Sequence, residues 1–219
     1  VVRWLWETAE NDEEKARVKA LFPKILAWHR WFHRFRDPIG KGLVLSTHPW
    51  EGGRDNSPEW DKPSSTVDVS KVEPYVRRDT SHLDQSMRPT KLDYDRYLAL
   101  VQFGRDQNWD HDVIARDNPF RVYDVGLTMI LLRADRDLSW LVATLGYEAE
   151  ALELQNRVAL AENGVNWLWN EDIGAFCSRD AITEESSSMI TSASFLAFFA
   201  GVGDDEQRAA LIANFDRIA

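Results

Sequence analysis

Helical periodicity, interrupted by one long segment that lacks it, most constrains the fold of this chain. Apolar residues recur at helical spacing over residues 12–35 and again through most of the sequence after residue 90. Residues 38–90 carry no such pattern and are rich in Pro, Asp and Ser. These patterns predict an all-α chain of about six helices with almost no strand. Broad apolar stripes and short turns between consecutive helices favour stacked helical hairpins over a four-helix bundle.

Capping residues and helix breakers predict where the helices begin and end. Thr90 is the expected N-cap of a helix over residues 91–106, and Asp124 is the expected N-cap of a long helix that Gly146 ends. The remaining expected boundaries are a restart at Pro23, a helix over about 148–169, a helix from Ser188 to Ala200, and a capping pair of Asp204 with Gln207 on the last helix.

Composition excludes several classes of partner and one compartment. The net charge of −10 argues against nucleic acid and anionic membranes, because both require basic surfaces. The single cysteine, Cys177, excludes an internal disulfide and is typical of a reducing compartment, so we expect a cytoplasmic protein. Neither a membrane-spanning run nor a signal peptide is visible. Both ends interrupt a pattern, at Val1 and at Ala219, which predicts that the chain is part of a longer protein.

The segment His48–Asp61 is the most informative part of the long aperiodic region. It reads His-Pro-Trp-Glu-Gly-Gly-Arg-Asp-Asn-Ser-Pro-Glu-Trp-Asp, which places two prolines, two glycines, two tryptophans and four acids in fourteen residues. The prolines and glycines exclude a regular helix or a central strand. The segment is therefore predicted to be an ordered loop that holds carboxylates beside aromatic rings. Carbohydrate chemistry uses that combination, because acids move protons and flat rings hold sugar faces.

Residues 43–61 resemble the catalytic-acid signature of glycoside hydrolase family 63 and its trehalase-like relatives, including the mannosylglycerate and glucosylglycerate hydrolases of bacteria. The pattern of that group is His-Pro-Trp-Glu-Ser-Gly-x-Asp-Asn-Ser-Pro-x-Trp-Asp. This chain departs from it at Gly52, which stands in place of Ser. Weaker similarity covers most of the chain, including residues 27–31 and 123–125.

The resemblance implies both a fold and a reaction. The family fold is an (α/α)6 toroid of twelve helices around a central active site, so residues 1–219 would be a single partial domain, roughly its first half, with the loop 38–90 carrying the acid. The reaction inverts the anomeric centre: one carboxylic acid protonates the leaving oxygen, while a separate carboxylate activates water on the opposite face. It requires no cofactor. The expected substrate is a small α-glycoside, such as an α-glucosyl or α-mannosyl glycerate.

In this resemblance Asp55 is the general acid, the Asp of the Asp-Asn-Ser-Pro unit. A general acid must keep its proton near neutrality. The rings of Trp50 and Trp60 would favour the protonated form through apolar surroundings, and Glu51 and Asp61 through like charge.

Further residues match substrate-binding positions of the family. Trp50 corresponds to a residue that lines the sugar pocket, and Glu51 and Asn56 would bind sugar hydroxyls or brace the loop. Arg88 and Tyr94 correspond to a pair that holds the glycerate, because a guanidinium forks onto a carboxylate through two parallel hydrogen bonds.

The general base of the family lies late in the toroid, and no Glu of this chain matches its motif. We therefore expect the base to be missing from this chain and the chain alone to be inactive, with a possible second half or another chain packing against it. A non-catalytic carbohydrate-binding or remnant module is the alternative. A sugar epimerase on the same toroid is a further alternative, but the Asp-Asn-Ser-Pro loop argues against it, since those enzymes rely on histidines.

Two metal-like patterns are set aside, and no metal site is expected. Residues 106–112 have calcium-loop spacing, but His111 stands where the loop needs Gly, so we predict helix caps there. His29 and His33 are four apart on a helix without the Glu of a zinc-protease motif, which favours a helix surface or satisfied packing.

Overall fold

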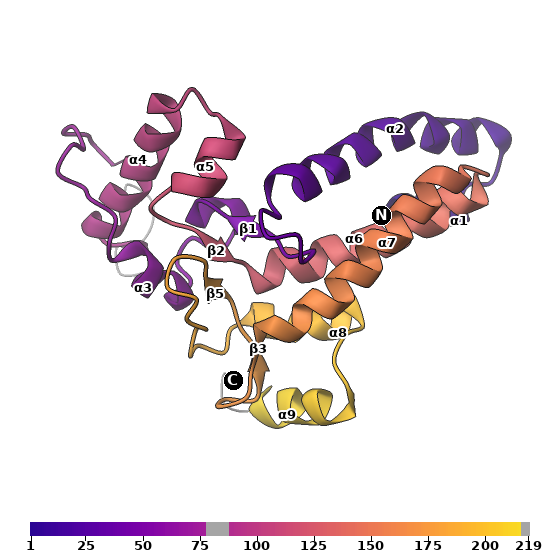
Figure 1. Ribbon diagram of the computed structural model, residues 1–219. Coiled ribbons are helices and arrows are strands. Elements are labelled where there is room, and N and C mark those ends of the chain that lie inside the picture. The colour runs from indigo at the N-terminus through magenta and orange to yellow at the C-terminus, as the bar shows by residue number, and fades with distance from the viewer. Residues whose placement is uncertain (78–87, 216–219) are drawn as a thin grey trace.

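The structure, a computed structural model, describes residues 1–77 and 88–215 (Figure 1). Part of the predicted long loop, residues 78–87, and the end of the last predicted helix, residues 216–219, lie outside the described residues.

Helices dominate the described part of the chain, which confirms the all-α prediction. The longer helices are α2 (Asp12–Phe35), α4 (Lys91–Asp106), α6 (Val125–Thr144), α7 (Glu148–Gly164) and α9 (Asp205–Phe215). The shorter ones are α1 (Val2–Glu7), α3 (Asp61–Ser64), α5 (His111–Asp117) and α8 (Leu196–Ala200). Short 3-10 helices occur at η1 (Pro49–Gly52), η2 (Pro58–Trp60), η4 (Val165–Leu168) and η5 (Ser192–Phe195).

Three of the predicted helix caps are confirmed. Thr90 forms a capping box with Asp93 at the start of α4. The Asp124 carboxylate accepts hydrogen bonds from the backbone N–H groups of Gly126 at 2.7 Å and Leu127 at 3.1 Å, which caps α6. The Asp204 carboxylate accepts from the N–H of Gln207 at 2.8 Å. These side chains satisfy backbone donors that have no partner within the first helical turn.

Other predicted boundaries are wrong for identifiable reasons. Pro23 does not restart α2, because the carbonyl that loses its partner belongs to Lys19, an exposed residue that water can reach. Ser188 does not open a helix: the chain before it is extended, with the N–H of Ser187 donating to the carbonyl of Ser178 at 2.8 Å. Helix α7 ends at Gly164 instead of continuing to residue 169.

Two small sheets accompany the helices. Strands β1 (Leu45–Ser46), β2 (Val122–Tyr123) and β5 (Arg179–Asp180) form one antiparallel sheet, in which Leu45 pairs with Tyr123 and Val122 pairs with Asp180. Strands β3 (Trp169–Asn170) and β4 (Ala175–Phe176) form a hairpin. In Figure 1 the first sheet lies between the α4–α5 pair and the α6–α7–α8 layer, so it fixes where the loop after β1 begins.

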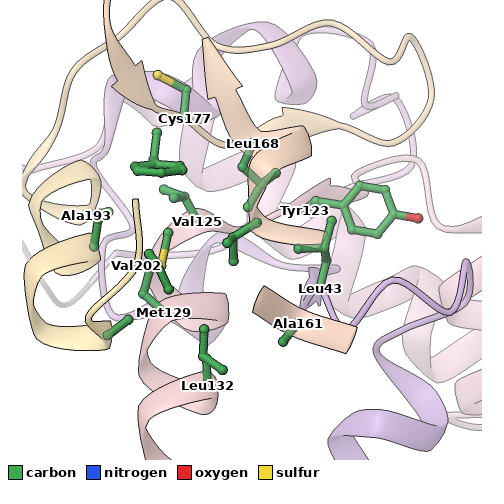
Figure 2. Close-up of a cluster of buried hydrophobic side chains, with 14 of the residues drawn as sticks. Leu43, Tyr123, Val125, Met129, Leu132, Ala161, Leu168, Cys177, Ala193 and Val202 are labelled. Carbon is green, nitrogen blue, oxygen red and sulfur yellow. The ribbon is translucent and has the colours of Figure 1, made fainter. Parts of the chain in front are cut away.

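Three buried clusters hold the elements together. The largest joins α6 to η4, β4 and α8, and Figure 2 shows Met129 and Leu132 of α6 in it together with Leu168 of η4. A second cluster packs α2 on α6 and α7. The third cluster contains Phe120 and Trp60, so it ties the acid-rich loop, through Trp60, to the rest of the fold. Within the described residues, no helix is long and apolar enough to cross a membrane.

Candidate active site

The loop after β1 is shaped by its own side chains. The ring of His48 caps η1: its Nδ1 accepts a hydrogen bond from the N–H of Trp50 at 3.1 Å. Gly53 follows η1 with a φ of 66°, a left-handed conformation that other residues rarely adopt. The N–H of Ser57 then donates to the carbonyl of Arg54 at 2.9 Å, which turns the chain so that Asp55 stands at the bend.

The side chain of Arg54 anchors the loop to α6. Its guanidinium pairs with Glu59 and, at 2.6 Å, with Asp124, the N-cap of α6. Its carbonyl accepts a hydrogen bond from the indole N–H of Trp60 at 2.6 Å. Burial raises the pKa of Asp124, against the lowering effect of the Arg54 charge. The Arg54 guanidinium therefore forms ion pairs with two buried carboxylates, Glu59 and Asp124, instead of with Asp55.

A pocket of about 210 Å³ opens beside this bend. Three of the predicted site residues, Asp55, Asn56 and Arg88, line it together. The other lining residues are Ser57, Trp60, Asp61, Ser64, Pro89, Thr90, Asp93 and Tyr97. The pocket thus combines carboxylates, one guanidinium and aromatic surface, a set able to hold a small polar ligand.

Trp50 and Tyr94 lie next to the pocket but do not line it. Their rings are 6.1 Å apart in an edge-to-face arrangement, and both contact Tyr97, at 5.7 Å from Trp50 and 6.2 Å from Tyr94. Trp50 is 41% exposed, so its indole is accessible at the surface. Trp50 and Tyr94 are therefore linked to the pocket through Tyr97, which lines it.

Glu51 lies away from the pocket and braces the loop. Its carboxylate pairs with Arg36 and accepts a hydrogen bond from the N–H of Thr47 at 2.9 Å. Of the two roles expected from the sequence, sugar binding or loop bracing, these contacts favour bracing.

Sequence reasoning placed Asp61 beside Asp55 but missed Tyr97 and Asp93 as pocket residues. Tyr97 lies three positions after Tyr94, a spacing that puts the two residues on one helix face. Partial burial, and then the neighbouring Asp93 carboxylate, raise the pKa of Asp61. Asp61 is therefore a carboxyl group of the pocket whose surroundings favour its protonated form.

No cluster of three or more His, Cys, Asp or Glu side chains suited to a metal ion occurs in residues 1–77 and 88–215. Asp110 caps α5, as predicted for the calcium-like segment. His29 and His33 both contact the buried carboxylate of Asp135, at 2.6 and 2.7 Å. Of the two settings expected for this pair, helix surface or satisfied packing, the structure shows satisfied packing.

The paired helices and the loop between them match about half of the helical-toroid fold of the family 63 glycoside hydrolases. The family described as "Mannosylglycerate hydrolase MGH1-like glycoside hydrolase domain" matches residues 2–219. The chain belongs to that family.

The relatives and solved structures that the chain resembles include mannosylglycerate hydrolases, in agreement with the family match. A mannosylglycerate hydrolase from Thermus thermophilus is 44% identical over 97% of this chain and 51% of its own length. Mannosylglycerate hydrolase MGH1 from Selaginella moellendorffii is 41% identical over 99% of this chain and 44% of its own length. The crystal structure of a GH63 mannosylglycerate hydrolase from Thermus thermophilus, in complex with Tris, superposes with a TM-score of 0.94 at 42% identity, covering 99% of this chain and 52% of that one. The chain spans about half the length of the relatives it matches.

Proposed function

We propose that this chain supplies the acid half of the active site of an inverting glycoside hydrolase that acts on a small α-glycoside. Family membership supports the hydrolase class. The single observation that carries the residue assignment is the pocket that brings Asp55, Asn56 and Arg88 together. The substrate class is an α-mannosyl or α-glucosyl glycerate, because the relatives include both mannosylglycerate and glucosylglycerate hydrolases.

Asp55 acts as the general acid in this proposal. It stands at the bend of a loop whose backbone is held by two side chains: the indole N–H of Trp60 donates to the carbonyl of Arg54, and the hydroxyl of Tyr97 donates to the carbonyl of Asp55. A proton donor must be held within hydrogen-bonding reach of the leaving oxygen, and a rigid loop serves that purpose. Because Arg54 is paired with Glu59 and Asp124, its positive charge does not compete for the Asp55 carboxylate.

Arg88 is the proposed partner of the glycerate carboxylate. It lines the same pocket as Asp55, so an aglycone protonated by Asp55 would lie near the guanidinium. A solved structure of the Thermus thermophilus relative contains both Tris and D-glycerate. Tyr94, on α4, lies beside this region and would contact the glycerate or the sugar through its ring.

The general base belongs, in this proposal, to a part of the family domain that residues 1–219 do not match. The relatives are about twice as long as the matched region, which leaves room for a second carboxylate. An inverting mechanism needs both groups, so the isolated chain should show negligible hydrolysis.

Asp55→Asn in the full-length protein tests the acid role. We expect kcat on an α-glycosyl glycerate to fall by about 10²- to 10⁴-fold, the usual contribution of a general acid. The loss should be smaller on a nitrophenyl α-glycoside, because a good leaving group needs little protonation. NMR of the first product formed should show the inverted, β-configured sugar.

Asp68→Asn provides a matched control, since Asp68 is an exposed aspartate in the same long segment and is absent from the pocket. It should keep the wild-type rate. Equal rates for wild type and Asp55→Asn on both substrates would remove Asp55 from the acid role. Sugar binding without hydrolysis in the full-length protein would instead favour the carbohydrate-binding module.

A further inference from the structure

Tyr97 of α4 forms hydrogen bonds with two residues of the acid-bearing loop, Asp55 and His48. Its hydroxyl donates a hydrogen bond to the backbone carbonyl of Asp55 at 2.6 Å. At its other end, the backbone carbonyl of Tyr97 lies 3.0 Å from Nε2 of His48. Between these bonds the Tyr97 ring contacts the rings of His48 and Trp50, at 5.8 and 5.7 Å.

The direction of each bond follows from chemistry. Nδ1 of His48 accepts from the N–H of Trp50, so in the neutral ring the proton sits on Nε2 and is donated to the Tyr97 carbonyl. Burial lowers the pKa of His48 and so favours this neutral form. One residue of α4 therefore holds the part of the loop that carries Trp50 and, separately, the peptide of Asp55.

The surroundings of the Tyr97 hydroxyl favour its role as a hydrogen-bond donor to the Asp55 carbonyl. The side chain is only 4% exposed. Burial raises the pKa of Tyr97 to about 12, and the carboxylates of Asp93 and Asp55 act in the same direction. The hydroxyl thus keeps its proton at and well above neutral pH, so it can donate to the Asp55 carbonyl throughout that range.

We propose that Tyr97 is a positioning residue, which sets the direction of the Asp55 side chain by holding the Asp55 carbonyl. The inference rests on the proposed acid role of Asp55. Rotation of a peptide swings the side chain attached to it, so loss of this bond would displace the carboxyl group from the leaving oxygen. A displacement of about 1 Å at a reacting group can cost on the order of 100-fold in rate.

The test compares Tyr97→Phe with Tyr123→Phe in the full-length protein. Tyr123 is equally buried, at 4% exposed, and burial likewise raises its pKa to about 12, but it lies in the core cluster of Figure 2. We expect Tyr97→Phe to lower kcat about 10- to 100-fold with less than about a threefold change in KM, because the substrate contacts remain. Tyr123→Phe should keep the wild-type values.

Two further measurements keep the test independent of folding and of activity. A fluorinated tyrosine with a more acidic phenol at position 97 preserves the ring, and kcat should fall as pH rises through the ionisation of that phenol. Hydrogen exchange of the backbone amides over residues 50–57 should be about tenfold faster in Tyr97→Phe than in the wild type, since the loop loses one of its anchors.

The outcomes separate this inference from the proposed function. An Asp55→Asn variant that loses activity beside a Tyr97→Phe variant with normal kcat and unchanged exchange would overturn the positioning role alone. A higher KM with unchanged kcat would also overturn it, because that result indicates direct substrate binding. An Asp55→Asn variant with the wild-type rate would reject the proposed function, while faster exchange in Tyr97→Phe would still support the anchoring of the loop.

Discussion

The carboxylate of Asp124 has one satisfied oxygen and one that is buried without a hydrogen-bond partner. Oδ1 accepts from Arg54 and from the start of α6, whereas Oδ2 has no partner in the described residues. A Cβ atom added to Gly52 would lie 2.9 Å from that Oδ2. Gly52 is also the position at which this chain departs from the serine of the family pattern. A serine hydroxyl at position 52 would therefore lie within reach of the unpartnered oxygen.

Gly52→Ser and Gly52→Ala should differ in stability. Both introduce a Cβ that crowds Asp124, at a cost of roughly 1–3 kcal/mol for an overpacked site. Only the serine can donate a hydrogen bond to Oδ2, which recovers about 1 kcal/mol. Urea unfolding should thus rank Gly52→Ser above Gly52→Ala by about that amount. An alanine variant as stable as the serine variant would show that no hydroxyl reaches Asp124.

Sequence alone identifies the proposed acid, Asp55, but not the residues that hold it in place. Asp55 follows from a dense local motif, because the prolines, glycines and tryptophans around it lie within fourteen residues. Tyr97 lies forty-two positions away, and its bond is to a backbone carbonyl, which leaves no side-chain signature. Long-range contacts to backbone atoms are invisible to a motif. The positions of Glu51 and Arg54 depend likewise on partners elsewhere in the fold.

At the scale of elements, capping was predictable and strand pairing was not. Thr90, Asp124 and Asp204 are local signals, and each cap forms as predicted. Each of these strands has only two residues, so an alternation of apolar and polar residues cannot be detected in the sequence. The extended path before Ser188 is imposed by pairing with the chain near Ser178, and so the helix predicted there does not form.

Helices α2 and α6 are joined by a buried polar contact, whose acceptor on α6 the spacing of the two histidines does not reveal. The Asp135 carboxylate is fully buried and contacts both His29 and His33. Burial acts to raise the pKa of Asp135, but the hydrogen bonds of the two histidines outweigh it and hold the pKa below its usual value. The stabilisation from the ionised carboxylate is therefore complete above pH about 4 and is lost as pH falls through the lower, folded-state pKa.

Asp135→Ala should destabilise the protein strongly. It leaves two histidines without their acceptor, and removing one partner of a buried polar group costs about 3–5 kcal/mol. Asp137→Ala, two residues along α6, removes a partly exposed partner of Arg133 and should cost less than about 1 kcal/mol. Urea unfolding at neutral pH measures both. Similar losses for the two variants would mean that the histidine contacts contribute little to the packing of α2 on α6.

At the scale of the whole molecule, the helices form part of the family fold and leave apolar side chains exposed. The similarity to the solved structure extends over nearly all of this chain but only 52% of that one. Trp4 and Trp28 are exposed on α1 and α2, and Phe198 and Phe199 are exposed on α8. In Figure 1 helices α2 and α8 lie on opposite sides of α6 and α7. Large exposed aromatics typically mark surfaces that another polypeptide covers.

We infer that the exposed aromatic rings of α8 contact helices of the unmatched part of the family domain. The chain, co-expressed with the unmatched part of the Thermus thermophilus relative, should then copurify with it. Phe198→Gln with Phe199→Gln should reduce that recovery by about tenfold or more, because each buried aromatic ring contributes about 1.5–3 kcal/mol. The two rings are 45% and 51% exposed, so the substitutions should leave the fold of the chain intact.

Ile182→Gln is the matched control, because Ile182 is 49% exposed but lies in the turn after β5 and outside the helical layer. It should not change the recovery. Circular dichroism should show the same helix content for the control, the double variant and the wild type. Unchanged copurification of the double variant would place the contact elsewhere, and the exposed face of α1 and α2 around Trp4 and Trp28 would then be the surface to test, since an incomplete ring of helices exposes a face at each of its two ends.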